Sequence, residues 1–418
     1  MTREDIIKTA FKVWGQDFYK TTSLSQITRE LGVSKPAIYR HFKDKEAVLD
    51  AMYVAFYDDF TNYVRKDYEK AMSMEKWQEC FLVITRILTE YYVLNRYAFI
   101  FSLTQVFSRR DSEKINDEFS ARGVNLTAFS RGKFETSVFP SRFHIVMLSL
   151  IYHVSIFHQN RRNSSEEILP DELKEIVHNI ETQITAGLAL APEIVAALDY
   201  KKLENQAAAG IPEYSGENPL LKAVAEAVAE AGPWNVSMEM VARRCGLSKS
   251  GLYAHFIDKQ DMLSKLFMTE FFNIIGYAKS QIETTELPEE QLYIGIISIV
   301  QHLRYRPELL MALDWLKTRH LDLKRAALEK LQEYIASIKL EVVKQQDQQF
   351  LLMLAQWILF MIVSIMAWWP SIKNNGSTVN WTKYIENIPN ESFRVLFRFI
   401  ALGFDGLDNV QEIEGVNV

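Results

Sequence analysis

The chain has 418 residues, a length that points to two or more domains rather than a single core. Hydrophobic residues make up 48% and charged residues 24%, which is the balance of a soluble globular protein and excludes a disordered or fibrous chain. The 16 Gly and 11 Pro are few for this length and favour long helices. The formal net charge of −6 excludes a uniformly basic coat for nucleic acid, but it leaves room for a local basic patch.

Residue patterns give no support to two kinds of chemistry. The two cysteines, Cys80 and Cys245, cannot build a disulfide framework, and no Cys or His spacing predicts a metal site. GxSxG, P-loop and GxGxxG motifs are missing from the sequence, so we expect neither an enzyme nor a bound cofactor. The charged start MTREDIIK is unlike a secretory signal, and we expect a reduced, cytoplasmic protein.

The strongest signal in the sequence is an internal repeat. Residues 23–45 recur without a gap as residues 237–259, and ten of these 23 positions are identical. Several of the remaining positions exchange one apolar residue for another, as Ile27 does for Val241. A period of 214 residues is far too long for a solenoid, so it indicates two tandem copies of a whole domain.

The boundary between the two copies has its own composition. The stretch NQAAAGIPEYSGEN is small and polar and carries two Gly and one Pro, which predicts a linker at residues 205–218. Each copy has a short head that carries the repeated motif and a longer helical body. We therefore expect heads at residues 1–50 and 219–264, and bodies at residues 51–204 and 265–418.

Each head has the pattern of two short helices joined by a tight turn. Leu24, Ile27 and Leu31 fall on one face of the first helix. Gly32 is expected to end that helix, and Ser34 to be the N-cap of the second. Two short helices with a glycine in the turn predict a helix-turn-helix.

The second helix of the head separates an apolar face from a polar one. Ile38 and Phe42, four positions apart, predict its buried stripe, which leaves Lys35, Tyr39 and Arg40 for solvent or DNA. The repeated 23 residues carry five cations and two carboxylates in the first copy, and four cations and two carboxylates in the second. Local positive charge on an amphipathic helix is typical of DNA binding. The alternative is a helical hairpin with a solvated charged face.

The segments LSQITRELGVSKPAIYRHFKDKEAVL and SMEMVARRCGLSKSGLYAHFIDKQDML resemble the DNA-binding head of the TetR family of transcriptional regulators. The Gly-x-Ser and Tyr-x-His-Phe-x-x-Lys spacings carry the resemblance, which covers both heads, while the bodies match only in length and character. The resemblance implies an all-α fold of two tandem units. Each unit would have a three-helix head and a helical body that binds a small effector and carries the dimer interface. A regulator of transcription, with repression as the expected sign, follows from the same resemblance.

The resemblance also implies roles for individual residues on a double-stranded DNA operator. It implies phosphate contacts for Ser23, Arg40, His41 and Lys45. It implies major-groove contacts for Lys35, Pro36, Ala37 and Tyr39. The corresponding residues of the second head are Ser237, Lys249, Ser250, Gly251, Tyr253, His255 and Lys259. The second head departs from the first where Ser250, Gly251 and Ala254 replace Pro36, Ala37 and Arg40.

One chain carries both heads, whereas helix-turn-helix regulators need two heads about one helical turn (~34–36 Å) apart. We therefore expect a monomer that acts as an internal pseudo-dimer on an operator with two non-identical half-sites. Gly251 costs its helix about 0.5–1 kcal/mol relative to Ala, which favours weaker binding by the second head. One alternative is a homodimer in which only the first head reads DNA. Another is a small-molecule-binding protein that has lost DNA binding.

The first body offers a candidate effector site. The run of residues 77–107 is apolar and rich in aromatic residues, as ligand pockets are. Tyr91, Tyr92, Phe99 and Phe101 are candidates to line a pocket for a small hydrophobic effector of unknown identity. The alternative for each of these residues is ordinary core packing.

Two helices are expected to close each half, at residues 142–159 and 171–190 and at residues 350–369 and 391–407. The resemblance implies that they pair into a four-helix bundle between the halves. Residues 350–369 contain no charge, so a membrane span is an alternative for this segment. We expect a buried helix and no membrane partner, since this is one such segment in a duplicated soluble fold.

Overall fold

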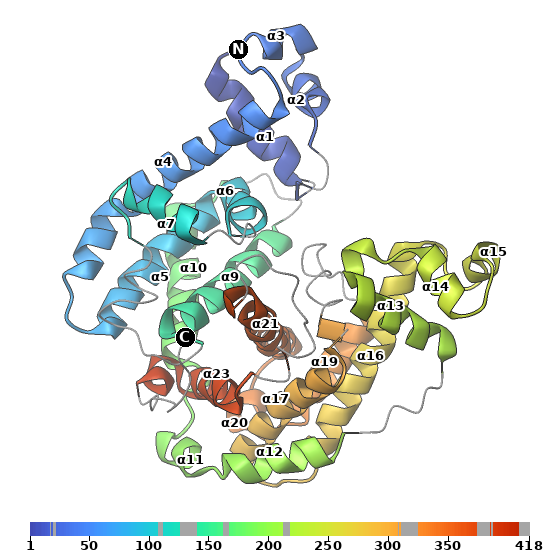
Figure 1. Ribbon diagram of the computed structural model, residues 1–418. Coiled ribbons are helices and arrows are strands. Elements are labelled where there is room, and N and C mark those ends of the chain that lie inside the picture. Colours follow the sequence, from blue (N-terminus) through green and yellow to red (C-terminus); the bar gives the residue numbers. More distant parts are fainter. Residues whose placement is uncertain are drawn as a thin grey trace. The chain divides into compact units, whose positions relative to one another are not determined.

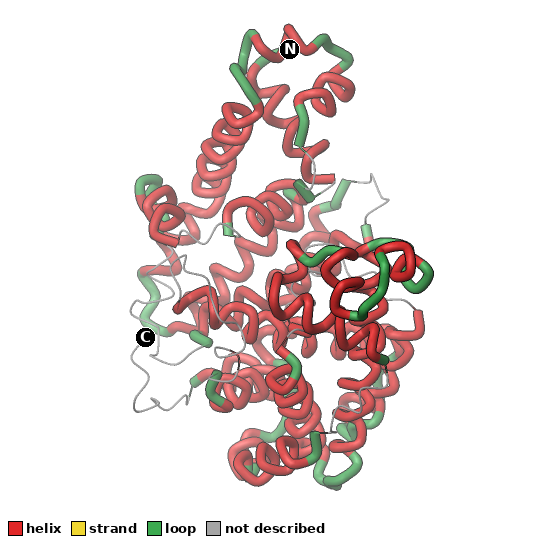
Figure 2. The backbone as a smooth tube through the Cα atoms, turned by 45° about the vertical axis from the view of Figure 1, so that its right-hand side comes forward, coloured by secondary structure: helices red, strands yellow, loops and turns green. Residues whose placement is uncertain are grey.

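The structure, a computed structural model, is built from helices joined by short connections. The residues that it describes are 1–16, 18, 19, 22–107, 112–125, 140–161, 167–211, 218–307, 309, 310, 325–373, 385 and 388–408. These residues form helices and no strand, which confirms the expected all-α fold (Figure 2). The chain divides into two compact units, Met1–Thr185 and Ala186–Val410.

Unit 1 has a head of three short helices and a body of longer ones (Figure 1). The head holds α1 (Arg3–Gln16), α2 (Leu24–Leu31) and α3 (Lys35–Tyr39). The described helices of the body are α4 (Lys45–Met72), α5 (Trp77–Leu94), α6 (Arg96–Phe101), the π-helix η1 (Ser102–Val106), α7 (Ser112–Ser120), α9 (Arg142–Asn160) and α10 (Pro170–Ala186).

Unit 2 repeats this plan after two additional helices, α11 (Pro192–Ala197) and α12 (Tyr200–Ala209). Its head holds α13 (Pro219–Asn235), α14 (Met238–Arg244) and α15 (Lys249–Tyr253). The described helices of its body are α16 (Lys259–Ile282), α17 (Pro288–Tyr305), α19 (Arg325–Ala336), α20 (Glu341–Lys344), α21 (Gln348–Lys373), α23 (Asn390–Leu402) and the 3₁₀-helix η2 (Gly403–Leu407). The expected tandem arrangement of two head-and-body units is confirmed.

The same junction joins head to body in both units. Asp44 accepts a hydrogen bond from the Ala47 N–H at 2.7 Å, and Asp258 accepts one from the Asp261 N–H at 2.8 Å. Each carboxylate satisfies an N–H that the start of a helix leaves without an intrahelical partner. Helices α4 and α16 therefore begin at the same point of each head and run from there into the body (Figure 1).

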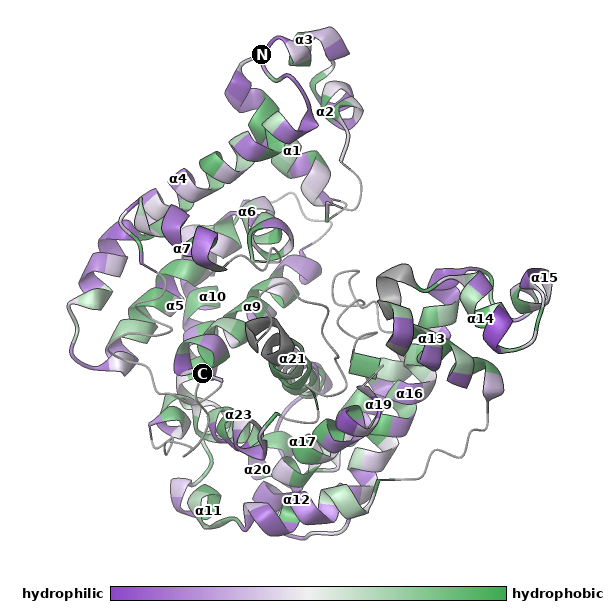
Figure 3. Cartoon of the chain, viewed as in Figure 1, coloured by the Kyte–Doolittle hydropathy of each residue, from purple (hydrophilic) through white to green (hydrophobic). Residues whose placement is uncertain are grey.

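Aromatic rings fill the core of the first body. Hydrophobic and hydrophilic residues alternate along α4, and its apolar stripe faces the core (Figure 3). Phe56 on this stripe is 2% exposed, and its ring lies 5.6 to 5.8 Å from the rings of Tyr57, Phe60 and Phe101. Such ring pairs contribute about 0.5–1.5 kcal/mol each beyond the burial of their area.

The units divide before the expected linker at residues 205–218. Glu204 on α12 is buried, and its carboxylate receives two hydrogen bonds from Arg394 of α23, at 2.7 and 2.9 Å. Tyr293 of α17 donates a third at 2.7 Å. Residues 186–204, which the composition assigned to the first body, therefore lie in unit 2. Helix α12 also continues to Ala209, five residues into the expected linker, so the composition did not mark the end of the helix. Buried contacts decide which unit a helix joins.

The segment between α10 and α11 requires a glycine at position 187. Gly187 has a φ of 55°, and a Cβ there would lie 2.6 Å from the Ile400 carbonyl oxygen, so a larger residue would clash. Beyond it, the N–H of Leu188 donates to the Ile400 carbonyl at 2.8 Å, and the N–H of Leu190 donates to the Ala401 carbonyl at 3.0 Å. These bonds satisfy carbonyl groups that the end of α23 leaves free. They also hold residues 187–190 to unit 2.

Helix α21 contains the whole uncharged segment 350–369. Among the described residues, Gln348–Ala367 is one stretch long and apolar enough to cross a membrane. More than half of it is buried in the protein, and Trp357, Met361 and Ile365 are fully buried. The helix packs against α19 and α23 of its own unit. This burial is typical of the core helix that the sequence led us to expect.

Replacing Glu204 with Ala should lower the free energy of unfolding by about 3 kcal/mol, because Arg394 and the Tyr293 hydroxyl lose a buried partner. Urea denaturation followed by far-ultraviolet circular dichroism measures the change. Lys201→Ala, at an exposed position of the same helix, should change the free energy of unfolding by less than about 0.5 kcal/mol. Equal effects of the two substitutions would contradict the contribution of the buried pair.

Two buried histidines make the stability depend on pH. Burial lowers the pKa of His158 from 6.5 to about 4, although its Nε2–H donates to the Tyr92 carbonyl at 2.8 Å. Burial, with the charge of Arg306 added, lowers the pKa of His302 to about 4 as well. In the unfolded chain both side chains take up a proton near pH 6.5. The contribution of these two histidines to the free energy of unfolding is therefore fully present above pH 6.5 and is lost as the pH falls toward 4.

At pH 5 each of these histidines should destabilise the fold by about 2 kcal/mol relative to pH 7. His158→Gln keeps a donor for the Tyr92 carbonyl and removes the titrating group. The variant should therefore lose about 2 kcal/mol less than the parent chain between pH 7 and pH 5 in urea denaturation. An identical pH dependence of the two proteins would show that His158 keeps its ordinary pKa.

Candidate DNA-binding site

Each head contains a helix-turn-helix with the same turn. Gly32 ends α2 with a φ of 65°, and the N–H of Val33 donates to the Thr28 carbonyl at 3.0 Å. In the second head Gly246 also has a φ of 65°, and the equivalent bond is 2.9 Å long. A turn with this φ closes without strain when its residue has no Cβ. The glycine turn expected from the sequence is confirmed in both copies.

Apolar contacts fix the rotation of α3 and α15, which we call the recognition helices. Ile38 of α3 is fully buried, and Phe42, three residues past the end of that helix, is 3% exposed. In the second head Leu252 of α15 and Phe256 have the same two exposures. Burying side chains of this size contributes about 1.5–3 kcal/mol each. Both residues expected to be buried are buried in each head, but the helix is shorter than expected and ends at Tyr39 and Tyr253, before the second of them.

The buried stripe leaves a polar face directed outward. Tyr39 keeps 53% of its surface exposed and Tyr253 keeps 47%, large fractions for aromatic side chains. The other exposed candidate residues are Lys35, Pro36, Arg40, Lys249, Ser250 and His255. Ala37, His41 and Gly251 are partly exposed. The groove-contact candidates of each head are thus exposed or partly exposed on the short recognition helix.

Four of the candidate phosphate contacts lie at helix starts, whereas Arg40, His41 and His255 follow the ends of α3 and α15. Ser23 is the N-cap of α2, where its N–H donates to Gln26 Oε1 at 2.8 Å, and Ser237 is the N-cap of α14. Lys45 and Lys259 are the first residues of α4 and α16. Helix N-termini carry partial positive charge and unpaired N–H groups, so they suit phosphate oxygens.

The two recognition helices differ at their first turn. In α15 the Ser248 Oγ accepts a hydrogen bond from the Gly251 N–H at 3.0 Å and lies 3.0 Å from the Ser250 Oγ. In α3 the position of Ser250 is held by Pro36, whose fixed φ suits the first turn of a helix. A Cβ on Gly251 would lie 3.3 Å from the Ser248 Oγ, a close contact that rotation of the hydroxyl relieves. The glycine therefore lowers helix stability without being required by space.

Acidic side chains accompany the cations of the second head. Arg244 of α14 forms ion pairs with Glu230 and, at 4.0 Å, with Glu226, both from α13. Arg243 pairs with Glu239 at 3.7 Å. Since these carboxylates compete with phosphate for the guanidinium groups, the two arginines add less to DNA attraction than their count implies.

Counting whole heads makes the difference between them clear. Residues 1–50 contain nine Lys and Arg against seven Asp and Glu, whereas residues 219–264 contain five of each. The repeated segments alone have more cations than carboxylates in both heads, because the second segment starts after α13 and leaves out its acidic residues. The acidic residues of α13 are thus a signal that lay in the sequence outside the repeated motif.

Helix α1 completes the first head, although the repeated motif starts after it. Trp14 is fully buried, and its indole N–H donates to the Ser23 carbonyl at 3.3 Å. Ile6, Ala10 and Val13 are buried on the same helix and follow helical spacing. This periodicity was the signal that could have identified α1 from the sequence.

The four candidate effector residues lie in the packed core of the first body. Tyr91, Tyr92, Phe99 and Phe101 are 0 to 6% exposed, and neighbouring rings meet at centroid distances near 5.3 Å. The Tyr91 hydroxyl also donates to Asp59 Oδ2 at 2.7 Å. These contacts match ordinary core packing, and the role of the four residues as an effector lining stays a prediction.

Phe101 connects the first head to its body. Its ring lies 5.0 Å from that of Phe11 on α1, and 5.0 and 5.6 Å from those of Tyr53 and Phe56 on α4. The side chain is fully buried, so a movement of α6 displaces rings of both the head and α4. These ring contacts connect α6 of the body with α1 of the head through packed side chains.

Both heads match one protein family. The family model described as bacterial regulatory proteins, tetR family, matches residues 6–52 and 220–266. Each match takes in the three helices of one head and the start of the long helix that follows. The bodies lie outside the two matches.

Two curated relatives are similar over a single head. The uncharacterized HTH-type transcriptional regulator YuxN of Bacillus subtilis (strain 168) is 43% identical over 53 residues, which are 13% of this chain and 18% of that protein. The similarly named regulator YerO of the same organism is 43% identical over 47 residues, 11% of this chain and 16% of its own length. The matched segments thus span less than a fifth of either relative.

The fold, the geometry of both heads and these comparisons agree. Two helix-turn-helix heads with an exposed polar face stand at corresponding places in the two units, and both match the same family. The names of the relatives point to a regulator rather than to an enzyme. Each half of the chain therefore begins with a helix-turn-helix head of the tetR family of bacterial regulatory proteins.

Proposed function

We propose that the chain is a cytoplasmic repressor that binds one operator with both heads and releases it when a small molecule binds in a helical body. The observation that carries the proposal is the exposed face of each recognition helix. Lys35 and Tyr39 lie outward over a buried apolar stripe, and Lys249 and Tyr253 do the same in the second head. Core packing alone gives no reason for two copies to keep the same outward side chains.

The proposed contacts follow the geometry of the heads. Lys35, Pro36, Ala37 and Tyr39 enter the major groove, as do Lys249, Ser250, Gly251 and Tyr253 in the second half-site. Ser23, Arg40, His41 and Lys45 bind phosphates beside the groove. Ser237, His255 and Lys259 bind them in the second half-site. Since Ala254 stands in place of Arg40, the second head makes fewer phosphate contacts.

One chain is proposed to act as an internal pseudo-dimer. Both heads are present in the same polypeptide, and their recognition helices differ at three positions, so the operator has two non-identical half-sites. The second candidate is a homodimer in which only the first head of each chain reads DNA. The second head has equal numbers of cations and carboxylates and carries Gly251, and both features favour weak DNA binding by this head. They support this candidate over an arrangement in which both heads bind DNA equally well.

An effector is proposed to act through the long helices. In the first unit the Phe101 ring of α6 contacts rings of both α1 and α4. In the second unit α16 begins with Lys259 at the head and contributes buried residues to the core of the body. A molecule that binds better to a body conformation in which the heads do not fit the operator lowers the affinity of the chain for DNA. By linkage, DNA lowers the affinity of the chain for the molecule by the same factor.

The stoichiometry on DNA tests the pseudo-dimer. The mass of the complex between the purified chain and DNA from upstream of its own gene, measured by native mass spectrometry, should correspond to one 48.5 kDa chain per duplex. A binding site selected from random duplexes should be asymmetric at the positions read by the two recognition helices. Two chains per duplex, or a perfect palindrome, would support the homodimer instead.

Restoring a cation to the second head should change the salt dependence of DNA binding. Ala254→Arg adds a phosphate contact, so the slope of log affinity against log salt concentration should steepen by about 0.9. Arg40→Ala in the first head is the matched control and should reduce the slope by about the same amount. Fluorescence anisotropy at several salt concentrations measures both. An unchanged slope for Ala254→Arg with a reduced slope for Arg40→Ala would mean that the second head does not touch DNA.

A further inference from the structure

The first head carries a cation that lies outside its repeated motif. Arg3 begins α1, and its Cζ lies 4.5 Å from the centre of the Phe42 ring. The buried residues Ile6 and Ala10 follow Arg3 at helical spacing, so Arg3 shares the side of α1 that packs into the head. The guanidinium therefore covers from outside a ring that is 3% exposed. Arginine favours aromatic rings because its cation is planar and weakly hydrated.

The carboxylates near Arg3 do not neutralise it. The Asp5 carboxylate accepts a hydrogen bond from the Thr2 N–H at 2.6 Å and lies 4.0 Å from the amino group of Met1. Glu4 follows Arg3 directly, and side chains one position apart lie on different sides of a helix. Arg3 is exposed, and its guanidinium has no ion pair or hydrogen bond with any residue that the structure describes. Its N–H groups are therefore available to an anion.

Phe42 places this guanidinium beside the start of α4. Lys45, the first residue of α4, is three residues after Phe42, a separation of at most about 11 Å along the chain. The start of α4 is one of the proposed phosphate sites, since a helix N-terminus carries partial positive charge and unpaired N–H groups. Phosphates follow one another every ~3.4 Å of helix axis on each strand of duplex DNA. A neighbouring phosphate of the same strand therefore lies close to Arg3 when Lys45 binds the first.

The second head has a cation over the equivalent ring, but that cation is paired. Lys265 Nζ lies 5.5 Å from the centre of the Phe256 ring, and Phe256 is the equivalent of Phe42. Lys265 Nζ also lies 2.9 Å from Asp261 Oδ2 and donates to the His255 carbonyl at 3.0 Å. A lysine that is held by a carboxylate and a carbonyl of its own unit attracts phosphate less.

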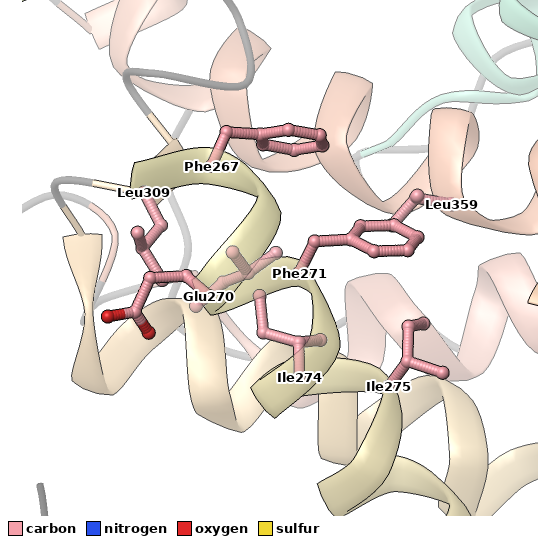
Figure 4. A pocket seen from close by; sticks show the side chains of 8 residues that line it. Phe267, Glu270, Phe271, Ile274, Ile275, Leu309 and Leu359 are labelled. Carbon is pink, nitrogen blue, oxygen red and sulfur yellow. The ribbon is translucent and has the colours of Figure 1, made fainter. Parts of the chain in front are cut away.

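Packing of α16 keeps Lys265 at the surface, next to Asp261. Phe267 and Phe271 of α16 line an apolar pocket together with Leu359 of α21 (Figure 4). The cavity is about 10 Å³, room for about one water molecule, so these rings fill the inward side of the helix. Side chains two positions apart do not share a side of a helix, so Lys265 does not follow Phe267 inward, and 47% of its side chain is exposed. Lys265 therefore stays on the outer side of α16, where Asp261 holds it.

The two heads differ in sequence at the positions that decide this pairing. Ala47 and Ala51 stand in the first head where the second head has its ion pair. The offset of 214 residues places Glu217, which lies outside the described residues, at the position of Arg3. The cation over the ring thus comes from α1 in the first head and from α16 in the second. Of the two, the cation from α1 has no carboxylate partner in the part of the chain that the structure describes.

We propose that Arg3 is a further DNA contact of the first head, and that it binds a backbone phosphate next to the one at the start of α4. A guanidinium that lies over a ring keeps the N–H groups along its edges, and these suit two oxygens of one phosphate. Because Phe42 already holds the side chain, little conformational freedom is lost when DNA binds. The second head has no such contact, since Lys265 is paired. The inference rests on the proposed function, because it adds a contact to the same DNA-binding site.

The salt dependence of DNA binding tests this contact. The full chain is titrated with a duplex of random sequence and about three helical turns (~30 base pairs), and fluorescence anisotropy gives the affinity at several salt concentrations. Arg3→Gln should make the slope of log affinity against log salt concentration less steep by about 0.9 and weaken binding about tenfold at low salt. Arg3→Lys keeps the charge, so it should keep the slope, with an affinity between those of the parent chain and Arg3→Gln. An unchanged slope for Arg3→Gln would overturn the proposal.

Two variants serve as controls for charge. Lys265→Gln removes the paired cation that lies over the equivalent ring of the second head. Lys66→Gln removes an exposed cation of α4 that lies about 32 Å along the helix from Lys45. Both controls should keep the slope of the parent chain. A change in either control as large as that in Arg3→Gln would contradict the assignment of the contact to Arg3.

Thermal unfolding separates the contact from a structural role, and the parent chain separates it from the proposed function. If Arg3 only stabilised the head through Phe42, Arg3→Gln would lower the unfolding midpoint and leave the slope as it was, which rules out the contact. An affinity of the parent chain that does not depend on salt concentration would contradict DNA binding itself. Salt-dependent binding with one slope in all variants would contradict the contact of Arg3 alone.

Discussion

The burial of one side chain in each recognition helix, and of a second just after it, determines which residues can reach DNA. Ile38 of α3 and Phe42, three residues past the end of that helix, are buried, as Leu252 of α15 and Phe256 are in the second head. Because the buried residue occupies one face of its helix, the remaining faces lie outward. The glycine turn sets the direction of the helix, and the aspartate cap after it starts the long helix of the body. Every proposed contact with DNA depends on this packing, whereas the packing does not depend on the polar residues that it exposes.

That independence lets the two heads diverge. The buried stripe and the turn are the same in both, while the outward residues and the flanking helix have changed. Arg244 is paired with Glu226 and Glu230 of α13, and Ala254 leaves a gap where the first head has a cation. These changes alter the electrostatic attraction to phosphate and leave the fold intact. In an assembly of identical chains both heads would change together. Within one chain each head can be altered alone, which is why we propose an operator with two non-identical half-sites.

Much of the head could be derived from the sequence, and less of the bodies. Local signals such as Gly32 and Ser34 identified the turn and the start of the second helix, and the structure has them at those places. The unit boundary was harder to predict. The first five residues of the polar stretch at 205–218 continue α12, and membership of a unit depends on partners far away in sequence, such as Arg394 for Glu204. Long-range pairing of this kind leaves no periodic trace in a single sequence.

The two bodies, like the two heads, differ at equivalent positions. At equivalent positions, one body has the rings of Phe56 and Tyr91 and the other has Glu270 and His302. The described part of the first body has Phe56 and Asn95 where the second body buries the ion pair of Glu270 and Arg306. A buried ion pair lowers stability relative to apolar packing, so the two bodies are stabilised by different interactions. The first body is packed around aromatic rings. Its ring contacts reach from α4 to α1 through Phe101.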